Sequence, residues 1–133
     1  MFILDCTMTI TLYGIPNCDT VKKARLWLAA HGLGFTFHDV KKQPLERATM
    51  LQWLEQLPSA LLVNRKGTTW RALPDERKAA IIADDGAEAA IALMLELPSV
   101  IKRPVLAHAG RFHVGFSDQQ YQQIFTIQDE PSP

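Results

Sequence analysis

The residue best suited to chemistry is a cysteine between a short β-rich run and a helical pattern. Residues 9–13 (TITLY) favour a strand, Gly14 and Pro16 end it, and a helix is predicted from Asp19. Cys18 therefore lies at the amino end of a helix, where backbone amides and the helix dipole stabilise a thiolate. Cysteines so placed have pKa values of roughly 3.5–7.5 instead of about 8.5. We interpret Cys18 as a nucleophile, although most free cysteines are small buried hydrophobic residues.

Polar neighbours of this cysteine could assist it. Asn17, Asp19 and Thr20 are typical helix-capping residues, and a cap beside a nucleophile can also contact a substrate. Lys22 follows about one turn into the helix and could attract an anion, but a solvated helix face explains a lysine equally well. We therefore include these four residues in a candidate binding site around Cys18.

The chain has two cysteines, Cys6 and Cys18, too few for a disulfide framework. A CxxC motif is absent because Val21 is the third residue after Cys18. Cys6 belongs to the N-terminal segment and is interpreted as incidental. A redox reaction at Cys18 would therefore need a thiol from another molecule to complete it.

Composition favours a single domain over residues 1–133. Of these residues, 47% are hydrophobic, enough for a core, while 14 basic and 14 acidic side chains cancel. Neither nucleic acid nor a membrane surface is indicated as a partner. No run approaches the roughly 20 apolar residues of a membrane span, and the first residues lack a signal sequence, so we expect a cytoplasmic protein. Met8 is a conceivable internal start, in which case residues 1–7 form an extension.

The order of predicted elements indicates an α/β fold. A helix over 19–31 and a strand over 35–40 form a parallel βαβ unit with the first strand. The helix has an apolar face made of Val21, Ala24, Trp27, Leu28 and His31.

Residues 44–98 are predicted to be a helical insertion. Helical patterns cover 45–57, 74–84 and 87–97, whereas 59–63 is a short apolar run and 68–73 is ambiguous. The apolar positions expected in the first of these helices are Leu45, Ala48, Leu51 (or Gln52), Trp53, Leu54 and Leu57.

The remaining elements complete a four-stranded mixed sheet with flanking helices. A hairpin is predicted over 105–116, and Ser117 or Asp118 can cap a last helix that ends at Phe125. The core of the domain then comprises 8–43 and 99–127, and residues 128–133 are expected to be frayed.

Four segments of the chain resemble the arsenate reductase family, which also contains Spx and YffB. They are TLYGIPNCDTVKKARLWL, LLVNRKGTTWRAL, PSVIKRPVL and VGFSDQQYQQIF, and the motifs YGIPNCDTVKKA and IKRPVL are most similar to the YffB-like branch. The resemblance spans about residues 9–125 and implies a thioredoxin-like fold in which Pro104 is cis.

The resemblance also implies roles for the site residues. The cysteine at position 18 would attack an oxyanion or a disulfide, and arginines matching Arg103 and Arg65 would bind negative charge beside it, with Arg71 a nearby alternative to Arg65. Glutathione-coupled arsenate reductases use a third arginine, and Val114 occupies that position here.

We therefore expect a glutathione-dependent thiol reductase, or an arsenate-reductase-like oxidoreductase, with one nucleophilic cysteine. The family and the lack of a second site cysteine imply that glutathione is a co-substrate. Either glutathione or a glutaredoxin would then supply the thiol that resolves the intermediate. The protein is expected to be a monomer without a tightly bound cofactor. The alternative is a Spx-like regulator that binds RNA polymerase, although Spx proteins usually carry CxxC at this site. The histidines are scattered, so no metal site is predicted: His31, His38, His108 and His113.

Overall fold

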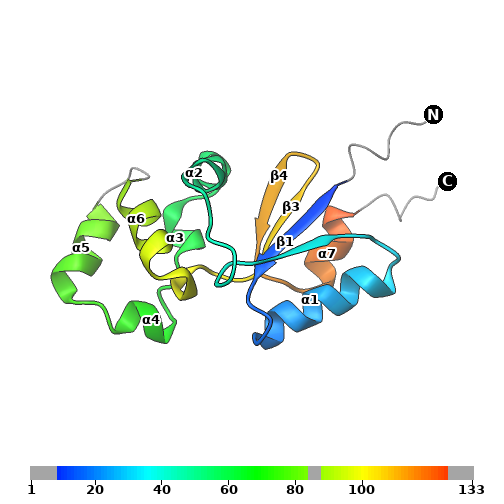
Figure 1. Cartoon of the computed structure of the whole chain (residues 1–133), viewed down its shortest axis with the longest axis horizontal. Helices are drawn as coiled ribbons and strands as arrows, with labels where there is room; N and C mark the ends of the chain where they lie inside the picture. Colours follow the sequence, from blue (N-terminus) through cyan, green and yellow to red (C-terminus); the bar gives the residue numbers. More distant parts are fainter. Residues whose placement is uncertain (1–8, 84–87, 126–133) are drawn as a thin grey trace.

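The computed structural model describes residues 9–83 and 88–125, and a four-stranded sheet forms its middle layer (Figure 1). The strands lie in the order β2-β1-β3-β4; β1 and β2 are parallel, and the other pairs are antiparallel. The predicted thioredoxin-like mixed sheet is therefore confirmed. The strands are β1 (Ile10–Gly14), β2 (Thr36–Asp39), β3 (Val105–His108) and β4 (Arg111–Val114).

The helix α1 (Asp19–Ala30) links the two parallel strands, as the sequence pattern predicts. A Cβ atom at Gly14 would lie 2.8 Å from Cγ2 of Val21, so glycine lets the end of β1 approach the first turn of α1. That close approach positions the segment that carries Cys18.

One face of the sheet is covered by α1 and by α7 (Asp118–Ile124). Trp27 is buried there, and its Nε1 donates a hydrogen bond of 2.5 Å to Oδ1 of Asp118. His31, predicted on the apolar face, is instead exposed, because its ring stacks on the outer side of Trp27 with 3.7 Å between ring centroids. The buried residues of this core are Ile10, Leu12, Ala24, Trp27, Leu28, Leu106, Tyr121 and Phe125.

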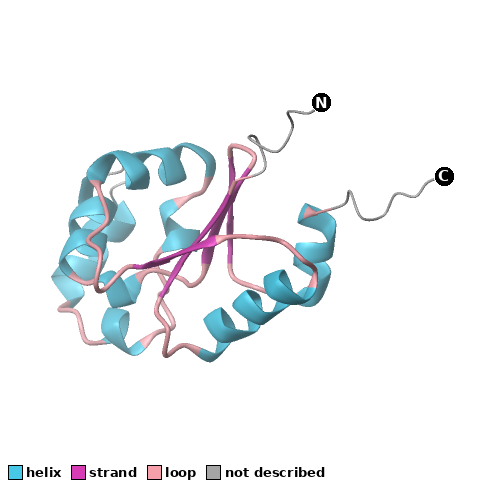
Figure 2. Cartoon of the chain, turned by 45° about the vertical axis from the view of Figure 1, so that its right-hand side comes forward, coloured by secondary structure: helices cyan, strands magenta, loops and turns pink. Residues whose placement is uncertain are grey.

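The opposite face is covered by the helical insertion, on the left in Figure 1. Figure 2 shows the helices surrounding the sheet from a second angle. The ambiguous segment 68–73 contains one of these helices, and the short apolar run 59–63 contains another. They are α2 (Arg47–Gln56), α3 (Ser59–Leu62), α4 (Thr68–Arg71), α5 (Asp75–Ala83) and α6 (Glu88–Glu96), followed by the 3₁₀ turn η2 (Pro98–Val100).

The buried side of α2 differs from the predicted one. Ala48 and Leu51 are exposed, Leu51 at 38%, whereas Met50 and Trp53 are fully buried. The reason is that positions 50, 53, 54 and 57 form the i, i+3, i+4, i+7 stripe that faces the core, and Leu51 lies beside it.

The proposed extension (1–7) and the residues expected to be frayed (128–133) lie outside the described residues. Within the described residues, no helix has the length and apolar character needed to cross a membrane.

Candidate active site

Cys18 is the N-cap residue of α1, in extended backbone conformation. Its N–H donates to the carbonyl of Ile15 (3.2 Å), and its own carbonyl accepts from the N–H of Lys22 (2.9 Å), the first bond of the helix. These bonds hold the cysteine at the amino end of α1, where the amides of the first turn have no helical partner. Its side chain is partly buried and has no disulfide.

The surroundings of the Cys18 sulfur favour the thiolate. Burial acts to raise the pKa of the thiol, but the backbone amide of Val21, the guanidinium of Arg103 and the amide of Thr20 together lower the pKa below its ordinary value. Arg103 contributes both as a hydrogen-bond donor and as a positive charge. A lowered pKa increases the fraction of thiolate, which is the nucleophilic form of cysteine.

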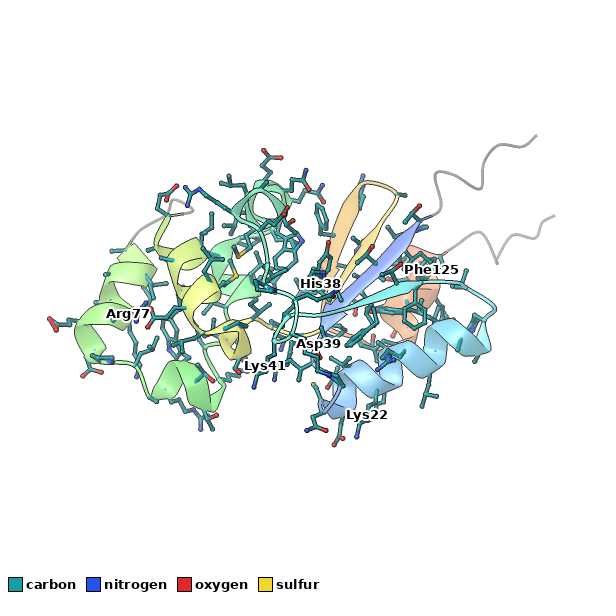
Figure 3. All side chains as sticks on the ribbon, in the orientation of Figure 1. Lys22, His38, Asp39, Lys41, Arg77 and Phe125 are labelled. Atoms are coloured by element: carbon teal, nitrogen blue, oxygen red, sulfur yellow. The ribbon has the colours of Figure 1, made fainter. Side chains whose placement is uncertain are left out.

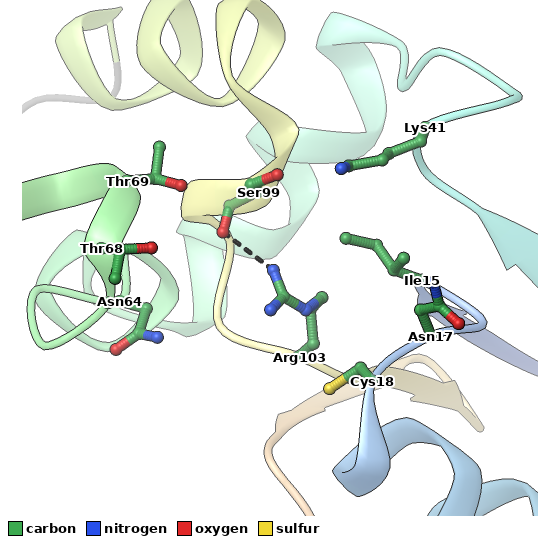
Figure 4. Close-up of a pocket in the computed structure, with 10 residues that line it drawn as sticks. Ile15, Asn17, Cys18, Lys41, Asn64, Thr68, Thr69, Ser99 and Arg103 are labelled. Carbon is green, nitrogen blue, oxygen red and sulfur yellow. Dashed lines mark hydrogen bonds between the residues drawn. The ribbon is translucent and has the colours of Figure 1, made fainter. Parts of the chain in front are cut away.

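Arg103 lies directly before the cis peptide bond to Pro104, which is buried and leads into β3. Its Nη1 donates to the carbonyl of Ser99 (2.8 Å), shown as the dashed line in Figure 4. Its Nε is buried and has no hydrogen-bond partner in the described structure. The guanidinium is thus held in place and still has a donor available.

A pocket of about 410 Å³ opens beside Cys18 and Arg103 (Figure 4). The loops at the sheet edge and the helical insertion both contribute to its walls. The sheet side supplies Ile15, Asn17, Cys18, Lys41 and Arg103; the insertion and η2 supply Asn64, Gly67, Thr68, Thr69 and Ser99.

Backbone bonds fix the two walls relative to each other. The N–H of Asn64 donates to the carbonyl of Val100, and the N–H of Lys102 donates to the carbonyl of Leu62, each at 2.7 Å. Val63 also forms a β-bridge with Ile101. The wall that carries Asn64 is therefore attached to the loop that carries Arg103.

Several predicted site residues come together in this pocket. Asn17, Cys18 and Arg103 all line it, and Pro104 follows Arg103 directly. Thr20 contributes its backbone amide to the sulfur.

Other predicted residues lie elsewhere. Cζ of Arg65 lies 5.5 Å from the Trp70 ring centroid, and Arg65 is not among the residues lining the pocket. Asp19 begins α1 but does not line it either. Lys22 lines a separate hollow with Leu26 and Phe35, on the outer side of α1 (Figure 3).

The residue at the position of the third arginine of glutathione-coupled arsenate reductases supplies no positive charge to this pocket. Val114 ends β4, and Arg111, at the start of that strand, lines a different hollow with Gln56 and Phe112. Among the described residues, Arg103 is the one arginine that lines the Cys18 pocket.

Lys41, Thr68 and Thr69 line the pocket but were not recognised in the sequence. The βαβ order of the sequence points to Lys41, because β1 and β2 are parallel and the loops that follow them lie at the same end of the sheet. Gly14 pairs with Asp39, and the N–H of Val40 donates to the carbonyl of Gly14 (3.0 Å). This pairing places the loop after β2 beside the loop that carries Cys18.

No metal centre is formed by the part of the chain that the structure describes. There, no three histidine, cysteine, aspartate or glutamate side chains gather in a way that could hold an ion. The chemistry of the pocket therefore rests on a thiol, a guanidinium, an ammonium group and neutral polar groups.

Comparison with known protein families gives a match over most of the chain. The model of the ArsC family matches residues 13–124, which includes both Cys18 and Arg103. The chain belongs to the ArsC family. Arsenate reductases are members of this family, and the chain is related to them.

Two solved structures are similar to this ArsC-family protein over nearly their whole length. The YffB protein is 43% identical, with a TM-score of 0.78, and the match covers 86% of this chain and 96% of YffB. An arsenate reductase (ArsC) related protein from Brucella melitensis is 46% identical, with a TM-score of 0.69, covering 90% and 96%. The global transcriptional regulator Spx of Streptococcus agalactiae is more distant, at 27% identity over 84% of this chain and 79% of Spx.

Proposed function

We propose that this ArsC-family protein is a glutathione-dependent thiol reductase in which Cys18 is the single protein nucleophile. The supporting observation is the environment of the sulfur: two backbone amides and the Arg103 guanidinium lower its pKa, and it opens into a pocket. Val21 occupies the position at which a CxxC protein carries its second cysteine. The reaction must then end with an external thiol.

In the first step, the Cys18 thiolate attacks one sulfur of a disulfide formed between glutathione and a substrate thiol. A new bond forms between Cys18 and the glutathione sulfur, the original S–S bond breaks, and the substrate leaves as a thiolate that takes a proton from water. Arg103 stabilises the attacking thiolate before the reaction and can bind a carboxylate of the incoming molecule.

In the second step, the thiolate of a free glutathione attacks the glutathione sulfur bound to Cys18. Oxidised glutathione is released and the Cys18 thiolate is regenerated. The net reaction is a thiol–disulfide exchange in which the free glutathione is oxidised to one half of oxidised glutathione and the substrate sulfur is released as a thiol. A glutaredoxin thiol can replace the free glutathione as the resolving nucleophile.

Arsenate is a weaker candidate substrate than a disulfide. The third arginine of glutathione-coupled arsenate reductases falls on Val114, and Arg111 lines another hollow. Among the described residues, an oxyanion in the Cys18 pocket would therefore contact a single arginine, Arg103. A disulfide sulfur needs less positive charge around it than arsenate does.

A second candidate is a Spx-like regulator that binds RNA polymerase and uses Cys18 as a sensor. The similarity to Spx of Streptococcus agalactiae favours it, and Val21 in place of a second cysteine opposes a disulfide switch. Co-purification with RNA polymerase tests this candidate, since a reductase has no need to bind the polymerase.

The reductase function is tested with Cys18→Ser. We expect the glutathione-dependent reduction of bis(2-hydroxyethyl) disulfide to fall by about 10²-fold or more, because a serine hydroxyl is not ionised at neutral pH. Cys6→Ser is the matched control and should retain the parent rate. A Cys18→Ser protein with full activity would overturn the proposal.

A further inference from the structure

Lys41 presents an unused positive charge to the Cys18 pocket. It follows β2, and Figure 4 shows its side chain extending toward the space above Cys18 and Arg103. In the part of the chain that the structure describes, its ammonium group has no hydrogen-bond or ion-pair partner. The fold of the protein therefore gives this charge no structural role.

The turn that carries Lys41 is held in place. Oδ1 of Asp39 accepts hydrogen bonds from the backbone N–H groups of Lys41 (3.0 Å) and Lys42 (3.3 Å). Nε2 of His38 lies 2.8 Å from the carbonyl oxygen of Gln43 at the far end of the turn. Figure 3 shows Asp39 and Lys41 at the junction between the sheet and the insertion. The backbone of the turn thus directs Lys41 rather than Lys42 to the pocket.

The charges that line the pocket are of one sign. Lys41 and Arg103 are cationic, and no acidic side chain is among the lining residues of the described structure. The opposite wall offers the hydroxyls of Thr68 and Thr69 and the amide of Asn64, which are neutral hydrogen-bonding groups. Such a pocket suits a molecule with at least two anionic or acceptor groups, one near the sulfur and one farther away.

We propose that Lys41 binds a carboxylate of the molecule that reacts at Cys18, which makes the site selective for carboxylate-bearing thiols and disulfides such as glutathione. The inference rests on the proposed reductase function and goes beyond it by assigning the selectivity to one residue. Arg103 acts at the sulfur, and Lys41 acts on the part of the molecule that does not react.

The test measures how fast Cys18 forms a mixed disulfide with two probes. Oxidised glutathione carries carboxylates, and bis(2-hydroxyethyl) disulfide carries none. In both reactions the Cys18 thiolate attacks a disulfide sulfur, the mixed disulfide forms, and the other half of the probe leaves as a thiolate. Mass spectrometry of the intact protein follows the product. All proteins carry Cys6→Ser, so the remaining cysteine is Cys18.

We expect Lys41→Met to slow the reaction with oxidised glutathione by about two- to fivefold, the usual range for an exposed ion pair. The rate with bis(2-hydroxyethyl) disulfide should stay unchanged. Lys41→Arg, which keeps the charge, should retain the parent ratio of the two rates. Lys42→Met is the matched control, because Lys42 lies next in the chain and does not line the pocket. Raising the salt concentration should lower the ratio of the rate with oxidised glutathione to the rate with bis(2-hydroxyethyl) disulfide, and it should lower this ratio more in the parent than in Lys41→Met, which keeps only the charge of Arg103 among the described residues that line the pocket.

The outcomes separate this inference from the reductase function. If the ratio of the rate with oxidised glutathione to the rate with bis(2-hydroxyethyl) disulfide is the same in the parent and in Lys41→Met, the role of Lys41 is overturned and the reductase proposal stays intact. Slower reaction of Lys41→Met with both probes also overturns it, because Lys41 would then act on the sulfur. If Cys18 of the parent reacts with neither probe faster than a cysteine in a short peptide does, the reductase function itself fails.

Discussion

At Cys18, burial and hydrogen bonding act on the thiol pKa in opposite directions. Burial raises the pKa, and the amides of Val21 and Thr20 together with Arg103 lower it further than burial raises it. Of these contributors, Arg103 is the one that a side-chain substitution removes without altering the helix. Its effect on the sulfur can therefore be measured separately.

We predict that Arg103→Gln raises the pKa of the Cys18 thiol, because the substitution removes a positive charge and a charged donor. The pH profile of iodoacetamide labelling should shift to higher pH, and labelling at pH 7 should slow severalfold. Iodoacetamide is neutral, so the profile reports the thiolate and not the binding of an anion.

Arg111→Gln is the control for this measurement, since Arg111 lines another hollow. Its labelling profile should match that of the parent. An unchanged profile in Arg103→Gln would mean that the helix amides alone stabilise the thiolate.

The sequence predicted the residues of the site that are close in the chain or carried by a motif. Cys18 and Asn17 lie at one strand end, and Arg103 stands beside the distinctive Pro104. Lys41 reaches the site through the parallel pairing of β2 with β1, which follows from the βαβ order and not from the residues around Lys41 itself. The family resemblance predicts Arg65 in the site, but in the structure its guanidinium lies over Trp70.

Among the elements, α7 shows how a short helix is fixed at its start. Oγ of Ser117 accepts a hydrogen bond from the N–H of Gln120 (3.0 Å), and Asp118 bonds to Trp27 of α1. The seven residues of α7 are too few for a helix that is stable alone, so these contacts and the burial of Tyr121 maintain it.

We predict that Ser117→Ala lowers the free energy of unfolding by about 1 kcal/mol, because the N–H of Gln120 loses its partner. Urea titration followed by circular dichroism measures the change. Gln119→Ala, at an exposed position of the same helix, should change stability by less than about 0.5 kcal/mol. Equal stability of the two variants would contradict the role of the cap.

The longer helices were predictable because they have clear ends and apolar periodicity. Examples are α1, which follows Cys18, and α6, which is followed by Pro98. One-turn helices such as α3 and α4 contain four residues each, too few to show a period, and tertiary packing of Leu62 and Trp70 determines them. The buried side of α2 also depends on tertiary packing, since burial of Met50 determines which side of the helix faces the core.

At the scale of the whole molecule, the sheet separates two cores, and its strands β3 and β4 each carry a histidine, His108 and His113. His108 is buried, with 4.7 Å between its ring centroid and that of Phe125. Burial lowers the pKa of His108, and burial together with the charges of His108 and Arg111 lowers the pKa of His113. Both histidines are therefore more readily protonated in the unfolded chain than in the folded protein.

We predict that the protein loses stability as the pH falls below about 6.5, the ordinary histidine pKa. In that range the unfolded chain binds protons that the folded protein does not, so unfolding is favoured by at most ~1.4 kcal/mol per pH unit for each histidine. Above that pH, both states hold neutral histidines and this contribution to the pH dependence disappears.

Urea midpoints at pH 7.5 and pH 5 test the prediction. His108→Leu should reduce the difference between the two midpoints, because one of the two histidines no longer titrates. A difference unaffected by His108→Leu would exclude His108 as a source of the acid sensitivity.

The pocket lies where the sheet and the insertion meet, and this has a consequence for how the protein can diversify. The reacting sulfur and its guanidinium belong to loops of the sheet, whereas Asn64, Thr68 and Thr69 belong to the insertion, which packs on the face of the sheet opposite α1 and α7. Substitutions at these three positions can change which molecules are accepted and leave the acidity of the sulfur unaltered. Relatives that share the cysteine and differ in the insertion are therefore expected to use one reaction on different substrates.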